Sequence, residues 1–198
     1  MKIILVGGTG TIGKAISSEL GKRHDLIKAS PNTGDVKLDM TSYASIEAMF
    51  KHIGKFDALV CTAGAGHFGP LAGMKEEHFY TGIKSKLMGQ INLVLSGTNY
   101  VSDSGSFTLT SGILSEDPIR GGAGLGFLNG AINSFAISAA IELPRGIRIN
   151  AVSPGLVEDS AGMSPYFPGH VLVSMQRLAS AYVKSVEGGI TGQVIKVY

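Results

Sequence analysis

Short apolar runs alternate along the chain with longer segments whose apolar residues recur every three or four positions. Short runs are typical of buried strands, and the longer periodic segments are typical of helices with one apolar face. We expect strands at 3–6, 25–30, 36–40, 56–61, 105–112 and 190–197, and helices at 14–20, 42–50, 75–96, 126–143 and 174–185. This alternation predicts an α/β fold, with a doubly wound parallel sheet of about seven strands and helices on both faces.

A glycine-rich turn joins the first predicted strand to the first predicted helix. Glycines allow the backbone to approach a pyrophosphate closely, and the following helix directs unpaired N–H groups at the anion. A plain turn can have the same glycine spacing, but the position directly after the first strand favours a dinucleotide site. The residues expected to bind the dinucleotide here are Gly7, Thr9, Gly10, Thr11, Ile12 and Gly13.

The end of the second strand bears on the type of dinucleotide. NAD-binding folds carry an acidic residue here that binds the ribose 2′-hydroxyl, whereas this chain has Ser30, Pro31, Asn32 and Thr33. Short hydroxyl and amide groups, with Lys28 nearby, tolerate a 2′-phosphate better than a carboxylate does. The sequence therefore favours NADP(H) over NAD(H). No arginine is present, however, to hold the 2′-phosphate. A plain turn after the strand is the alternative explanation for the same residues.

Three segments resemble motifs of the short-chain dehydrogenase/reductase family. Residues 57–64 read Asp-Ala-Leu-Val-Cys-Thr-Ala-Gly, residues 146–155 read Gly-Ile-Arg-Ile-Asn-Ala-Val-Ser-Pro-Gly, and residues 190–197 read Ile-Thr-Gly-Gln-Val-Ile-Lys-Val. The resemblance runs from Lys2 to Val197 and implies one NAD(P)-binding Rossmann domain of three αβα layers over residues 1–198. It also implies further cofactor contacts from Asp39, Met40, Ala63, Gly64, Pro154 and Gly155, beside Ser30 at the end of the second strand; a turn residue at a strand end is the alternative for Asp39.

The resemblance also identifies candidate catalytic residues, and here the chain departs from the family pattern. Ser111 matches the serine that binds the substrate carbonyl, while the family's Tyr-x-x-x-Lys pair falls at Leu125 and Asn129. Leucine has no proton to give, which removes the usual general acid. Lys86 stands where the family has a helix asparagine, so the lysine and the asparagine have changed places. We hypothesise that Lys86 reaches Asn129; drift after a loss of catalysis is the alternative.

Other groups are candidates for the missing proton donor. His67 follows the fourth strand, and an imidazole exchanges protons near neutral pH; a histidine on a surface loop is the alternative. Ser111 assisted by Lys86 is another candidate. Tyr166 is the third and lies in residues 156–169, which lack helical periodicity over most of their length and are expected to form an irregular substrate lid. Glu158 and Phe167 of that lid are candidate substrate contacts, and an inert surface loop is the alternative for the whole segment.

Composition and charge limit the classes of molecule that the protein is expected to bind. The net charge of +2 comes from scattered residues, which argues against a nucleic-acid or membrane partner, and no metal-binding motif is expected. The single Cys61 and the absence of a leader favour a cytoplasmic location. The resemblance implies a homodimer or homotetramer that pairs through helices 75–96 and 126–143.

Two functions fit these observations. The first is an oxidoreductase that uses NADP(H) on a small carbonyl or alcohol substrate with a non-standard proton donor. The second is a sensor that binds the dinucleotide without turning it over. The glycine turn supports both, and Leu125 and Asn129 favour the second.

Overall fold

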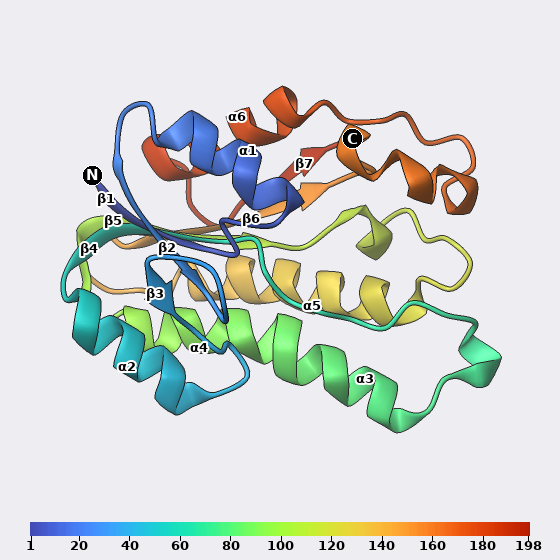
Figure 1. The fold of residues 1–198 in the computed structure, drawn as a ribbon, viewed down its shortest axis with the longest axis horizontal. Coiled ribbons are helices and arrows are strands. Elements are labelled where there is room, and N and C mark those ends of the chain that lie inside the picture. Colours follow the sequence, from blue (N-terminus) through green and yellow to red (C-terminus); the bar gives the residue numbers. More distant parts are fainter.

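Seven parallel strands form one sheet at the centre of the molecule (Figure 1). The computed structural model describes residues 1–198. The strands are β1 (Lys2–Val6), β2 (Asp25–Ser30), β3 (Val36–Lys37), β4 (Phe56–Cys61), β5 (Val101–Thr110), β6 (Arg148–Pro154) and β7 (Val194–Val197). Their order across the sheet is β3-β2-β1-β4-β5-β6-β7. The predicted doubly wound α/β fold is confirmed.

Helices cover both faces of the sheet, which gives three layers (Figure 1). The main helices are α1 (Thr11–Leu20), α2 (Tyr43–Ile53), α3 (Glu76–Gly82), α4 (Met88–Gly97), α5 (Ala123–Ala139) and α6 (Met175–Glu187). One face packs against α1 and α6, and the other packs against α2, α4 and α5. None of these helices is long and apolar enough to cross a lipid bilayer.

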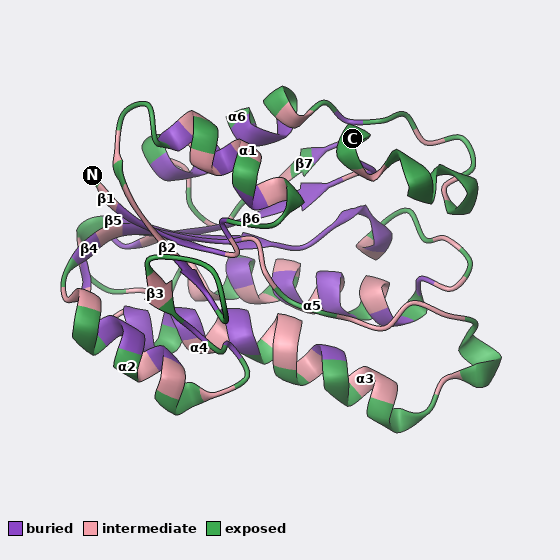
Figure 2. Ribbon diagram, in the orientation of Figure 1, coloured by how far each residue is buried: buried purple, intermediate pink, exposed green.

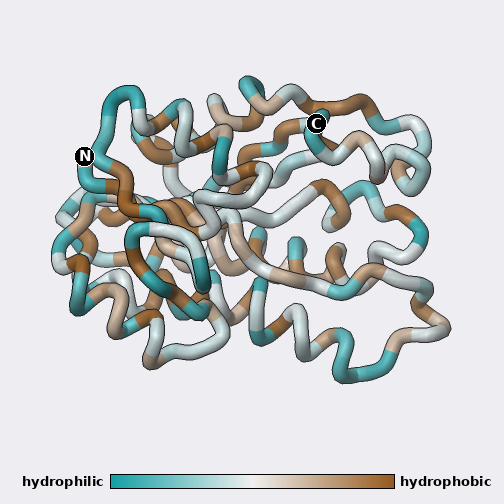
Figure 3. Tube along the Cα trace, viewed as in Figure 1, coloured by the Kyte–Doolittle hydropathy of each residue, from teal (hydrophilic) through white to brown (hydrophobic).

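The core lies where these helices meet the sheet. Strands β1, β4, β5 and β6 are buried along most of their length, and the apolar residues concentrate in the same central layer (Figures 2 and 3). A cluster of 21 buried residues fills the α2, α4 and α5 side, and a cluster of 14 fills the α1 and α6 side. Because both faces of a parallel sheet are covered, its strands read as continuous apolar runs rather than as alternating ones.

Several predicted boundaries were wrong. Strand β3 ends at Lys37 rather than at residue 40, because Thr41 N and Ser42 N turn back to bond Asp39. Strand β7 begins at Val194 rather than at 190, after Gly192 in a left-handed conformation with φ +68°. Helix α5 covers Ala123–Ala139, so it begins three residues and ends four residues earlier than predicted. The expected irregular lid contains a 3-10 segment, Glu158–Tyr166.

The predicted helix over 75–96 contains a change of helix type. Between α3 and α4 the chain forms one π-helical turn, Ile83–Leu87. Single π turns inside an α-helix often occur at functional sites, because the extra residue redirects side chains. Lys86 lies within this turn.

Candidate functional site

The glycine turn after β1 is a cradle of bare backbone. Gly7 has φ +80°, and Gly10 N donates a hydrogen bond to Gly7 O at 3.0 Å. A Cβ atom at Gly13 would lie 2.1 Å from Gly7 O, and a Cβ at Gly7 would lie 2.9 Å from Ala63 Cβ. No side chain fits at these two positions, so the backbone and the start of α1 are open to a phosphate group. The turn therefore fits a dinucleotide.

A cavity of about 200 Å³ lies on one side of this turn. It is lined by Gly7, Ser30, Asp39, Met40, Ala63 and Gly64, together with neighbouring residues of the same segments. The Asp39 carboxylate accepts hydrogen bonds from Thr41 Oγ1 at 2.8 Å and Thr41 N at 2.9 Å. These bonds hold the pKa of Asp39 below its usual value and keep the carboxylate ionised.

The loop after β2 forms a second, more open cavity of about 280 Å³. It is lined by Ser30, Pro31, Asn32, Thr33, Gly34, Val36 and Lys37, and contains one cation and no carboxylate. Thr33 N donates to Ser30 Oγ at 3.0 Å, and Thr33 Oγ1 donates to Thr9 Oγ1 at 3.3 Å. The loop is thereby tied to the glycine turn, and its lining suits a phosphate better than a pair of ribose hydroxyls.

A third cavity, of about 240 Å³, lies by the start of α1 and is called the reaction cavity below. Its lining includes Lys86 from the π turn, Ser111 after β5, Leu125 and Asn129 from α5, and Pro154 and Gly155 at the end of β6. Three of the four predicted catalytic residues, Lys86, Ser111 and Asn129, therefore lie together. Ile12, in the first turn of α1, also lines this cavity, so the helix that follows the cradle borders these side chains.

The Lys86 ammonium reaches across to α5. Lys86 Nζ donates hydrogen bonds to Asn129 Oδ1 at 2.8 Å and to Ser111 O at 3.1 Å. Burial without a carboxylate partner lowers the pKa of Lys86 to about 8. The hypothesis that Lys86 and Asn129 face each other is correct in its geometry. Asn129 is itself buried and fixes the ammonium from the opposite helix.

Gln90 holds the π turn against β5, and the sequence analysis missed it. Its side chain is fully buried; Nε2 donates to Lys86 O and to Thr110 O, and Oε1 accepts from Thr110 N. These bonds join the lysine-bearing turn to the end of β5, directly before Ser111. The sequence pattern that could have identified this residue is a glutamine on an otherwise apolar helix face, four residues after Lys86.

Leu125 occupies the reaction cavity without offering any polar atom. It packs against the loop after β4, where a Cβ at Gly66 would lie 2.6 Å from Leu125 Cδ2. The chain has one Tyr-x-x-x-Lys spacing, at Tyr80 and Lys84. Tyr80 is 57% exposed on α3, and neither residue lines the reaction cavity. That spacing therefore does not supply a substitute tyrosine.

The other proposed proton donors do not line this cavity. The His67 ring stacks on His78, with centroids 4.0 Å apart and an interplanar angle of 5°. Tyr166 is exposed and makes an edge contact with Phe68 at 5.3 Å. Both were candidates for the proton donor, and neither is among the residues that line the reaction cavity.

The lid residues divide between two roles. Phe167 lines the reaction cavity, and its role as a substrate contact stays a prediction. Glu158 Oε1 instead accepts a hydrogen bond from Met175 N at 2.9 Å, so this carboxylate caps the start of α6. The prediction of Glu158 as a substrate contact finds no support in this geometry.

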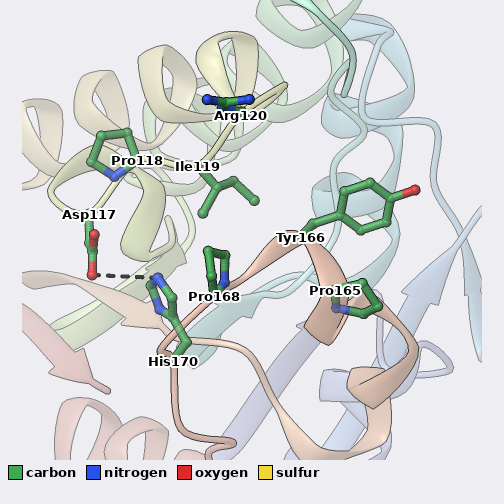
Figure 4. Close-up of a pocket in the computed structure, with 8 residues that line it drawn as sticks. All are labelled: Asp117, Pro118, Ile119, Arg120, Pro165, Tyr166, Pro168 and His170. Atoms are coloured by element: carbon green, nitrogen blue, oxygen red, sulfur yellow. Dashed lines mark ion pairs between the residues drawn. The ribbon is translucent and has the colours of Figure 1, made fainter.

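An outer cavity of about 410 Å³ lies between the Asp117–Arg120 segment and the end of the lid (Figure 4). Its lining includes Tyr166, Pro168 and His170, and His170 Nε2 pairs with Asp117 Oδ2 at 3.5 Å. The rings of His170 and Phe167 meet edge to face, with centroids 5.3 Å apart. Because Phe167 also lines the reaction cavity, the lid forms a wall shared by the two cavities.

Comparison with known proteins agrees with this arrangement. The family described as Enoyl-(Acyl carrier protein) reductase matches residues 12–181. The crystal structure of the protein lin1944 from Listeria innocua is 47% identical, with a TM-score of 0.98 and full coverage of both chains. A small-chain dehydrogenase in complex with NADPH is 28% identical, with a TM-score of 0.89, and covers 100% of this chain and 96% of that one.

One curated relative is an uncharacterized oxidoreductase of Methylorubrum extorquens, 26% identical over 151 residues. The match covers 76% of this chain and 58% of the relative. The matched region spans 58% to 65% of the length of the two curated relatives found.

Proposed function

Because the chain belongs to the short-chain dehydrogenase/reductase family, we propose that it is an oxidoreductase that uses NADP(H) on a small carbonyl or alcohol substrate. The observation that carries the proposal is that Lys86, Ser111 and Asn129 meet in a cavity whose wall includes Ile12, in the first turn of the helix that follows the glycine cradle. A dinucleotide held by the cradle would have its nicotinamide end beside these side chains. The proposed cofactor site and the proposed reaction site would then adjoin each other.

The preference for NADP(H) is supported by the lining of the loop after β2. A 2′-phosphate there would meet Ser30, Asn32, Thr33 and Lys37, without a carboxylate to repel it. The small-chain dehydrogenase at 28% identity is described as a complex with NADPH. Both observations favour the phosphorylated cofactor.

In the proposed reaction the bound nicotinamide supplies or accepts a hydride. Ser111 would orient the substrate oxygen, since its hydroxyl lines the cavity and makes only a long contact of 3.4 Å to Val152 O. Asn129 and the Ser111 carbonyl hold the ammonium in place. Leu125, Phe167 and the other apolar lining would exclude water from the reacting atoms.

The test begins with binding and ends with turnover. Calorimetric titration with NADPH and NADH should give the tighter constant for NADPH, and a panel of ketones, aldehydes and alcohols should then be followed at 340 nm, where reduced nicotinamide absorbs. Hydride transfer to or from any member of the panel supports the oxidoreductase. Cofactor binding without transfer across a broad panel contradicts it.

That second outcome would favour the alternative function, a sensor that binds the dinucleotide and does not turn it over. The specific observation behind this alternative is Leu125, which gives the reaction cavity a leucine where the family has a proton donor. In that case the binding of NADPH would alter a protein partner rather than a substrate.

We also infer that two or four copies assemble through α3, α4 and α5. Large apolar residues are exposed on these helices, including Tyr80, Leu95, Phe127 and Ile137. Phe79 of α3 contacts Phe127 of α5 edge to face at 6.1 Å, so α3 and α5 share one surface. Light scattering should give the mass of a dimer or a tetramer. A variant that combines Leu95→Glu and Ile137→Glu should have a lower mass in solution, because the assembly dissociates. The cytoplasmic location stays part of this proposal, supported by the single buried cysteine.

A further inference from the structure

The Lys86 ammonium has one hydrogen-bond donor without a partner in the protein. A lysine ammonium carries three N–H donors. Two of them are taken by Asn129 Oδ1 and Ser111 O, at 2.8 and 3.1 Å. The third has no acceptor within the chain, and Lys86 lines the reaction cavity. A substrate oxygen in that cavity is therefore offered a charged donor.

We propose that Lys86 is the proton donor of this enzyme, delivering its third Nζ proton directly to the substrate carbonyl oxygen. The inference rests on the proposed function and specifies the group that replaces the absent tyrosine. Leu125 has no ionisable group. The Lys86 ammonium is therefore the one acid among the side chains that line the reaction cavity.

The hydrogen bonds suit both protonation states of the lysine. A neutral amine keeps two N–H donors, which Asn129 Oδ1 and Ser111 O still accept. The position that held the proton then holds the lone pair. The neutral amine therefore leaves no buried N–H unpaired, which would otherwise be costly. The transfer therefore requires no rearrangement of the side chain.

No neighbouring charge ties the proton to Lys86. The titratable group beside it is the Cys61 thiol from β4, and burial raises the pKa of Cys61 to about 12, so the thiol stays neutral. The groups that face the ammonium from β5 and α5 are a carbonyl and an amide, both uncharged. Burial lowers the pKa of Lys86 to about 8, which is close to the range where an acid works best at neutral pH.

Reduction of a carbonyl group to an alcohol consumes one hydride and one proton. A bound reduced nicotinamide would supply the hydride: one of its C–H bonds would break, a C–H bond would form on the carbonyl carbon, and the C=O double bond would become a C–O single bond. The oxygen takes the proton from Lys86 Nζ, forming an O–H bond, and the N–H bond breaks. The products are an alcohol, an oxidised nicotinamide and a neutral Lys86, which regains its proton from water.

Two readouts test the proposal, and the first does not require turnover. In protein labelled with ¹³C and ¹⁵N, the Lys86 Cε–Nζ signal is assigned by its loss in Lys86→Met and followed from pH 6 to 11. We expect the titration midpoint of Lys86 to lie about two pH units below the midpoints of the exposed lysines. Lys84→Met, in the same π turn, should leave that low midpoint unchanged. A Lys86 midpoint near 10 overturns the proposal.

The second readout is the pH profile of carbonyl reduction. For the wild type, kcat/KM should be level below about pH 8 and fall tenfold per unit above it, because the ammonium is the active form. Asn129→Asp adds a carboxylate beside Nζ and should move the falling limb to higher pH. Lys86→Met should lose about 10²- to 10⁴-fold in kcat.

The outcomes separate this inference from the proposed function. Reduction by the wild type that persists at full rate in Lys86→Met, with the same pH profile, overturns the role of Lys86 and leaves the oxidoreductase standing. NADPH binding by Lys86→Met with an affinity within about threefold of the wild type shows that a lost rate comes from proton transfer rather than from a lost cofactor. Absence of turnover in the wild type across the panel overturns both.

Discussion

The glycine cradle and the reaction cavity meet at the same edge of the sheet, yet they depend on different atoms. The cradle is built from backbone N–H groups and from positions where a Cβ atom would collide, such as Gly13 with Gly7 O. The reaction cavity is built from the side chains Lys86, Ser111 and Asn129, which come from three separate segments. A site built from backbone atoms keeps its geometry when most neighbouring side chains are substituted. A site built from side chains can carry the same chemical groups at different sequence positions.

The exchange of lysine and asparagine that the sequence resemblance implies illustrates this difference. An ammonium donates and an amide oxygen accepts whichever of the two segments carries the lysine, and here Lys86 Nζ lies 2.8 Å from Asn129 Oδ1. What changes is the approach of the ammonium, which here comes from the π turn between α3 and α4. The Gln90 bonds to Lys86 O and Thr110 stabilise that turn.

The largest effect is expected in the cradle. Gly13→Ala places a Cβ 2.1 Å from Gly7 O, so α1 must move away from the turn. We expect a loss of about 2–4 kcal/mol in the free energy of unfolding and at least a roughly 100-fold weaker binding of NADPH. Chemical denaturation and calorimetry measure both. Gly162→Ala, with open space around its Cβ, should change the free energy of unfolding by less than about 0.5 kcal/mol. Unchanged NADPH binding in Gly13→Ala would contradict the cradle.

A double exchange tests the reaction cavity. Lys86→Asn and Asn129→Lys each break the Nζ to Oδ1 bond, and we expect each to lower the free energy of unfolding by about 1–3 kcal/mol. The double variant restores a lysine facing an asparagine and should recover to within about 1 kcal/mol of the wild type. Denaturant titrations of all four proteins give the coupling. Simple addition of the two losses would mean that the pair does not interact.

A smaller effect is expected at the loop after β2. Thr33→Asp adds a carboxylate to a lining that has none and should weaken NADPH binding at least tenfold, about 1.4 kcal/mol, with less than a threefold change for NADH. Thr33→Asn, without the charge, is the matched control. Equal losses for the two cofactors would show that the 2′-phosphate does not lie against this loop.

The smallest effect is expected at His67. Its ring stacks on His78 outside the lining of the reaction cavity, so His67→Ala should change kcat by less than about threefold. Steady-state rates at pH 6 and pH 8 check this. A loss near 100-fold would return His67 to the candidate proton donors.

The stability of the protein should also vary with pH through Lys86. Its pKa of about 8 lies below the value of an unfolded lysine, near 10.4, so the unfolded chain binds more protons between these values. The contribution of Lys86 to stability is therefore full above pH 10.4 and is lost as the pH falls through 8. Denaturation midpoints at pH 8 and 10 should show this rise in the wild type and a smaller one in Lys86→Met.

Parts of the site were predictable because they follow from local sequence. The glycine turn combines close residues with a strand before it and a helix after it, so one stretch carries the whole signal. The placement of Asp39, Ala63 and Gly64 followed from the ends of parallel strands, which share one edge of the sheet. His67 and Glu158 were misjudged because the path of a loop beyond its strand depends on what it packs against, here His78 and the start of α6.

The sequence by itself determined the order of strands and helices, the backbone cradle for a phosphate and the absence of a tyrosine at position 125. These properties reside in hydrophobic periodicity and in residue identity, which need no long-range contact. Only the tertiary structure decided that Lys86 meets Asn129 and Ser111, residues 43 and 25 positions away. That meeting depends on the π turn and on Gln90 holding it to β5, and packing between segments so distant in sequence has no local pattern.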